Sequence, residues 1–126
     1  MNEVPDEYQI ASLTCYNADE DQFGRVTAKP NGDGKFLAIQ GITIAVDPRL
    51  IPFGSKVLIP ELKDFSKNKD GIFLAHDTGS AVKAKLASIR RGVDYPVIDV
   101  FVDVPTRKLC EWNTKLGMVA RFKIIP

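Results

Sequence analysis

The feature that most constrains the fold of this chain is a set of short, apolar, β-branched runs that each carry an aspartate. The runs are 42–46 (ITIAV), 72–75 (IFLA) and 97–102 (VIDVFV), and the acids are Asp47, Asp77 and Asp99. Runs of this length, rich in Ile and Val, are typical of buried strands. The sequence therefore predicts at least three core strands that each deliver a carboxylate.

Of the three aspartates, Asp99 is the one whose position is least readily explained by a role in a turn. Aspartate is depleted inside strands, and Asp99 has no turn residue beside it. Side chains alternate along a strand, so Asp99 and Phe101 share one face while Ile98, Val100 and Val102 occupy the other. We expect the latter three to pack in the core.

Asp47 and Asp77 have an ordinary alternative explanation, which stays open at this point. Asp47 precedes Pro48, and Asp77 precedes the pair Thr78-Gly79, so both acids could simply serve turns. The functional alternative is that the carboxylates are grouped. Grouped carboxylates raise one another's pKa, which suits a general acid near neutral pH.

Length and composition indicate one soluble globular domain. The chain has 126 residues, of which 44% are hydrophobic and 26% charged. The formal net charge is +1, from 17 basic and 16 acidic residues, so electrostatics gives no reason to expect binding to nucleic acid or to an anionic membrane. No apolar run approaches the ~20 residues that span a membrane. Residues 1–10 lack the basic start and apolar core of a signal peptide, so either export does not use one or the sequence begins after its cleavage site.

The two cysteines leave two interpretations open. Cys15 and Cys110 are far apart in sequence and form no CxxC motif for metal or redox chemistry. They could form one disulfide that joins the two ends of the domain, or they could be two buried thiols. The absence of a visible secretory context favours the thiols slightly.

The pattern of apolar runs and turn residues predicts a β-rich fold. We expect a mobile leader over 1–8 and a single domain over 9–126. The expected strands are 9–16, 36–40, 42–46, 55–59, 72–75, 97–102 and 119–125, with loops at 17–23, 27–34 and 61–70 and a turn at 47–54. Helices are expected at Ser80–Arg91, which Gly92 would stop, and at Thr106–Leu116. Six or seven short strands in this length suggest a closed barrel, which removes exposed sheet edges.

Three ordered segments of the chain resemble the three-aspartate (3D) domain family. They are ITIAVDPRLIPFGSKVLIP around Asp47, GIFLAHDTGSAVKAK around Asp77, and VIDVFVD around Asp99. The opening LTCYN and the closing EWNTKLGMVARFKII also resemble the family pattern, so the likeness covers about residues 10–125. The resemblance implies a mainly β fold, a six-stranded double-psi β-barrel with short peripheral helices, whose groove holds a glycan strand.

The resemblance also implies an activity. Members of the family cleave the MurNAc–GlcNAc bond of peptidoglycan, and lytic transglycosylases do so with a single acid/base, leaving 1,6-anhydro ends. On this basis we expect a monomeric enzyme without cofactor or metal that acts on peptidoglycan in the cell wall or periplasm.

The site roles are assigned to residues that match the family motifs. Asp99 is chosen as the acid because Phe101 lies beside it on the strand and apolar surroundings raise the pKa of a carboxyl group. Asp99 is expected to be the catalytic acid/base, with Asp77 tuning it and Asp47 either assisting or bracing its loop. The expected substrate-binding residues are Thr14, Tyr16, Thr78, Gly79 and Lys83, although Lys83 could equally be a solvated surface lysine.

The chain departs from the family pattern at four places. Ser80 and Ala84 stand where the family has glycine, and 99 − 77 = 22 residues separate two acids that the family keeps close. An insertion at about 85–95 is expected to fill that gap with a helix and to reshape one groove wall. His76, the only histidine, is more often structural than catalytic in such a setting.

Three other functions remain open from the sequence. A hydrolytic, endoglucanase-like enzyme would use Asp47 or Asp77 as a second carboxylate that activates water. An expansin-like protein would bind glycan without cutting it. A non-enzymatic barrel would use its aspartates only to brace turns.

Overall fold

The computed structural model describes residues 8–17, 26–28 and 36–125. The expected leader, apart from its last residue, lies outside these ranges, as do most of the loops expected at 17–23 and 27–34. The side chain of Cys110 also lies outside the description, so the pairing of the two cysteines stays a prediction. The Cys15 thiol is buried and donates a hydrogen bond to the backbone oxygen of Leu109, with a donor–acceptor distance of 3.5 Å.

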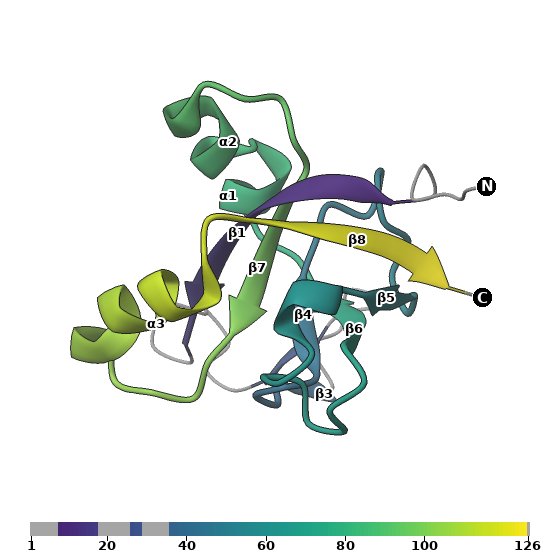
Figure 1. Ribbon diagram of the computed structural model, residues 1–126, viewed down its shortest axis with the longest axis vertical. Coiled ribbons are helices and arrows are strands. Elements are labelled where there is room, and N and C mark those ends of the chain that lie inside the picture. The colour runs from purple at the N-terminus through teal and green to yellow at the C-terminus, as the bar shows by residue number, and fades with distance from the viewer. Residues whose placement is uncertain (1–7, 18–25, 29–35, 126) are drawn as a thin grey trace.

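Six strands form one mixed sheet that closes on itself in the order β1-β7-β4-β6-β5-β8, a closed barrel. Their bounds are β1 Gln9–Tyr16, β4 Thr43–Ala45, β5 Lys56–Leu58, β6 Ile72–Asp77, β7 Val97–Phe101 and β8 Val119–Ile125. The pairs β1–β7 and β4–β6 are parallel and the other four are antiparallel. The mainly β fold is therefore confirmed. In Figure 1, β1 lies beside β8 along the first part of its length and beside β7 along the second part.

The core lies inside the closed sheet. It is formed by the inward side chains of all six strands, among them Leu13, Ile44, Val57, Phe73, Ile98, Val100, Val102 and Phe122. Alternation along β7 is therefore as predicted, because the residues on either side of Asp99 belong to this cluster. Phe101 belongs instead to a second cluster outside the sheet, with Tyr16, Ala38, Ala45, Val82 and Val97. The strands thus bury apolar side chains on both faces near Asp99.

The expected helix at 80–91 is two helices, α1 Ser80–Lys83 and α2 Leu86–Arg91. The continuous prediction was wrong because Lys85 adopts a left-handed backbone conformation, with φ of 54°, which breaks the helix. Gly92 ends α2 as predicted, with φ of 74° and its N–H bonded to carbonyls of the last turn. Figure 1 shows α1 and α2 together at one end of the closed sheet.

The second expected helix, Thr106–Leu116, is present as a 3₁₀ turn, Thr106–Lys108, followed by α3 Leu109–Leu116. The expected loop at 61–70 begins with another 3₁₀ turn, Pro60–Leu62, and joins the antiparallel strands β5 and β6. A separate two-stranded sheet pairs β2 Val26–Ala28 with β3 Phe36–Leu37. The strand expected at 36–40 is thus shorter than predicted, and β2 falls partly in a predicted loop.

Candidate active site

Asp99 and Asp77 lie in one row of residues that crosses four neighbouring strands. Thr14 on β1 pairs with Asp99 on β7, Asp99 pairs with Ala45 on β4, and Ala45 pairs with Asp77 on β6. Residues that pair directly across strands point to the same face of a sheet. The row belongs to the outer face, since Ala45 packs in the outer cluster with Tyr16 and Phe101.

A register shift in β6 brings Asp77 to this face. Ile44 pairs with Ala75, but the next residue, Ala45, pairs with Asp77, so His76 is left as the extra residue of a bulge. Strict alternation would put Asp77 on the inner side with Phe73 and Ala75. The bulge therefore decides that the second acid shares a face with Asp99.

Asp99 is held by Thr14 and remains partly exposed. The Thr14 hydroxyl donates a hydrogen bond of 2.9 Å to Oδ1 of Asp99. Both side chains are half-buried. Asp99 is the least buried of the three predicted acids, because Asp77 is 1% exposed and Asp47 is 5% exposed.

Asp77 is held from two sides. The Tyr16 hydroxyl donates a hydrogen bond of 2.8 Å to its Oδ2, and the backbone N–H of Thr78 donates one of 2.8 Å to its Oδ1. Tyr16 is itself buried and packs edge-on against Phe101, with ring centroids 5.4 Å apart. Strand β1 thus supplies one hydroxyl to each acid, from two residues that share a face.

Asp47 is bound to Arg49. Its carboxylate accepts hydrogen bonds from the backbone N–H, Nε and Nη2 of Arg49, the shortest being 2.8 Å between Nη2 and Oδ2. These hydrogen bonds outweigh the cost of burial and hold the pKa of Asp47 below its usual value, and the charge of Lys83 adds to the effect. The backbone oxygen of Asp47 accepts from Leu50 and Ile51. The acid therefore braces the turn at 47–51.

The remaining predicted site residues follow Asp77 along the chain. Thr78 and Gly79 are half-buried and lead into α1, and Lys83 at the end of α1 is exposed. The Thr78 hydroxyl oxygen is buried and has no hydrogen-bond partner among the described residues. Burial lowers the pKa of His76, so the imidazole is neutral at pH 7.

Two residues of the site were missed at the sequence level. Arg49 connects Asp47 to α1, because its Nη2 also donates to the backbone oxygen of Lys83, at 3.3 Å. The Asp-Pro-Arg spacing is a signal that could have found it, since aspartate often bonds the backbone two residues on. Ala45 has no such signal, because only the pairing shows that it separates the two acids.

The structure thus defines a closed, mixed β-sheet with a half-buried aspartate and a buried aspartate in one outward-facing row. Residues 42–88 match the family model of the 3D domain, the three-aspartate family that the sequence motifs resemble. The match contains Asp47 and Asp77 and ends before Asp99. A search of curated proteins finds no match.

Within 8–17, 26–28 and 36–125, no group of three or more His, Cys, Asp or Glu side chains is placed to hold a metal ion. None of the helices in these ranges is long and apolar enough to cross a membrane.

Proposed function

We propose that the protein is a cell-wall lytic transglycosylase that cleaves the MurNAc–GlcNAc bond of peptidoglycan with Asp99 as its single acid/base. The observation that carries the assignment of roles is exposure. Of the three motif aspartates, only Asp99 is accessible enough to touch a glycan, since Asp77 and Asp47 are buried. The 3D domain match supports the class of substrate.

The proposed reaction uses Asp99 twice. Its protonated carboxyl donates a proton to the glycosidic oxygen as the C1–O bond breaks. The resulting carboxylate then accepts the proton of the sugar's own 6-hydroxyl, whose oxygen bonds to C1 and closes a 1,6-anhydro ring. No water enters the product, because an oriented intramolecular hydroxyl replaces it. Thr14 orients the carboxyl through its hydrogen bond to Oδ1.

Asp77 supports this reaction electrostatically in our proposal. It is buried and accepts hydrogen bonds from Tyr16 and from the Thr78 N–H, contacts that favour the ionised carboxylate. Asp77 lies on β6, the strand next to Ala45, and its negative charge stabilises the positive charge that develops on the sugar. Asp47 does not take part, because its carboxylate is bound to Arg49.

We also propose that the closed sheet is the double-psi barrel that the family resemblance implies. Two parallel pairs, β1–β7 and β4–β6, meet at the antiparallel pair β4–β7, and this arrangement supports the assignment.

Hydrolysis is the second candidate, and one observation favours it. Asp99 and Asp77 flank β4, so their Cα atoms are about 9–10 Å apart by strand spacing. Inverting glycosidases use two carboxyl groups that flank the scissile bond and leave room for a water. Asp77 would then be the base, a role that requires its buried carboxylate to become accessible to that water.

Mass spectrometry of purified sacculi digested in H₂¹⁸O separates these functions. Transglycosylation yields 1,6-anhydro ends without ¹⁸O, whereas hydrolysis yields reducing ends that carry one ¹⁸O. Retention of the protein on sacculi without new ends would instead support an expansin-like role. The Asp99→Asn variant is the control for a contaminating hydrolase, because any activity that it retains does not arise from the proposed acid.

A further inference from the structure

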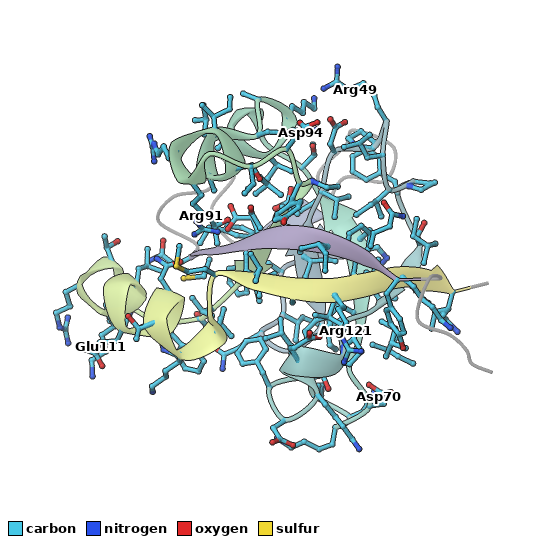
Figure 2. The ribbon with its side chains drawn as sticks, turned by 45° about the horizontal axis from the view of Figure 1, so that its top comes forward. Arg49, Asp70, Arg91, Asp94, Glu111 and Arg121 are labelled. Atoms are coloured by element: carbon cyan, nitrogen blue, oxygen red, sulfur yellow. The ribbon has the colours of Figure 1, made fainter. Side chains whose placement is uncertain are left out.

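Two cationic residues, Arg49 and Lys83, are neighbours beside Asp47. Arg49 lies in the turn that follows β4, and Lys83 ends α1. They are joined by the hydrogen bond from Nη2 of Arg49 to the backbone oxygen of Lys83. The Arg49 side chain is 72% exposed, and Lys83 is exposed. Figure 2 shows Arg49 projecting outward at the edge of the molecule, on the side of the sheet that carries α1 and α2.

The Arg49 guanidinium is held in place by a buried carboxylate. Asp47 binds Nε and Nη2, which leaves Nη1 facing away from the ion pair. Neither Nη1 of Arg49 nor Nζ of Lys83 has a hydrogen-bond or ion-pair partner in the described part of the chain. The ion pair with Asp47 therefore fixes the orientation of the Arg49 guanidinium, which presents Nη1 as a donor.

The local charge of this cluster is positive. Asp47 contributes −1 and the two cations +2, so the sum is +1. Since the whole chain also has a formal net charge of +1, general attraction does not draw anions here, and any preference must be local.

The cluster lies next to the proposed cleavage site. Asp47 is two residues beyond Ala45, which puts their Cα atoms within ~7 Å. Lys83 ends α1 and lies beside the same turn, because its backbone oxygen accepts the hydrogen bond from Arg49. A sugar adjacent to the scissile bond would therefore lie within reach of both cations.

We propose that Arg49 and Lys83 form a subsite for a carboxylate carried by the glycan, and that it selects carboxylate-bearing strands over uncharged ones. This inference rests on the proposed function. The planar guanidinium fork matches a carboxylate, and the lysine adds a compact charge. In peptidoglycan every second sugar bears a lactyl ether that ends in a carboxyl or a peptide, whereas a polymer of N-acetylglucosamine bears none.

The test is a binding measurement by calorimetry with two matched ligands. One is a soluble MurNAc–GlcNAc oligosaccharide with free lactyl carboxylates, and the other is the same oligosaccharide with those carboxyls converted to neutral amides. The Asp99→Asn variant is used so that neither ligand is cut. We expect the carboxylate form to bind roughly tenfold or more tightly, a preference that shrinks as salt is added.

The preference should be lost in Lys83→Gln and in Arg49→Gln and retained in Arg90→Gln. Arg90 is an exposed cation on α2 outside the cluster, so it is the matched control. Because Arg49→Gln also removes the partner of Asp47, the thermal melting of this variant is compared with that of Asp47→Asn. Lys83→Gln tests the ligand preference without changing the Asp47–Arg49 ion pair.

Equal affinity for the two ligands, binding of neither, or a preference that survives both substitutions would overturn the subsite. Its failure is distinguishable from failure of the proposed function. A protein that cuts sacculi but binds both ligands equally keeps the enzyme and loses the subsite. A protein that prefers the carboxylate ligand but cuts nothing keeps the subsite and loses the enzyme.

Discussion

Asp77 and Asp99 stand on opposite sides of the same residue, because each pairs with Ala45 from a neighbouring strand. The two acids are nevertheless in different environments. Asp77 is buried and bound by a tyrosine hydroxyl, whereas Asp99 is half-buried and bound by a threonine hydroxyl. Two carboxylates of one row can take separate roles when their surroundings differ in this way.

Asp99→Asn should abolish wall cleavage while leaving the fold intact. General acid–base catalysis is typically worth ~10²–10⁴ in rate, and the substitution keeps the shape of the side chain. The core does not depend on this carboxyl, since the neighbouring inward residues of β7 carry the packing. Release of soluble fragments from sacculi measures the loss, and melting temperature checks the fold. Asp64→Asn, at an exposed acid in the β5–β6 connection, is the control, and an Asp99→Asn enzyme with full activity would remove the mechanism.

Asp77→Asn should lower the rate less than Asp99→Asn does. An amide at this position still accepts a hydrogen bond but lacks the charge that stabilises the sugar cation in the proposed mechanism. The same sacculus assay ranks the two variants. The reverse ranking would assign the acid role to Asp77 and leave Asp99 as support.

Tyr16→Phe should destabilise the protein by about 1–3 kcal/mol, because it removes a donor from the buried carboxylate of Asp77. Chemical denaturation measures the free energy of unfolding. Tyr95→Phe is the matched control, since no described contact involves its hydroxyl, and it should change stability little. Equal effects of the two substitutions would contradict the importance of the Tyr16–Asp77 bond.

Thr14→Val should slow cleavage by roughly tenfold and leave folding nearly unchanged. Valine has the shape of threonine and suits a strand, but it lacks the hydroxyl that holds Asp99, and one such hydrogen bond is worth about 1 kcal/mol or somewhat more. Thr14→Ser keeps the hydroxyl and should retain most of the rate. Steady-state cleavage of sacculi compares the three proteins, and a slow Thr14→Ser with a fast Thr14→Val would refute this role.

His76→Gln should flatten the pH dependence of stability below about pH 6.5. Burial lowers the pKa of His76 in the folded protein, so the unfolded chain binds more protons in this window. The free energy of unfolding of the wild type should therefore fall as the pH drops below about 6.5. Denaturation curves at a series of pH values give the slope, and an unchanged slope in the variant would show that another group causes it.

Gly41→Ala should cost more stability than Gly54→Ala. Both glycines have positive φ, 86° and 83°, so both substitutions strain the backbone by about 1–2 kcal/mol. A Cβ at Gly41 would also lie 2.9 Å from the backbone nitrogen of Lys67, whereas one at Gly54 would meet nothing within 4 Å. Thermal melts of the two variants compare these costs directly.

Much of the local structure follows from the sequence alone. The strand Gln9–Tyr16 and the strand Val119–Ile125 have the predicted bounds, and the face of Asp99 follows from alternation along β7. The 3D motifs around Asp47 and Asp77 are likewise a property of the sequence, and the family match covers them. These features are readable because strand propensity and side-chain alternation act over a few neighbouring residues.

Only the tertiary structure decided which groups meet. The bulge at His76 moves Asp77 to the face of Asp99, Lys85 breaks the expected helix, and Arg49 holds Asp47 against α1. The hydroxyls that hold the acids come from residues 85 and 61 positions away in sequence. Register and contacts of this kind depend on how distant strands pair and pack when the sheet closes, and no local pattern of residues encodes that pairing.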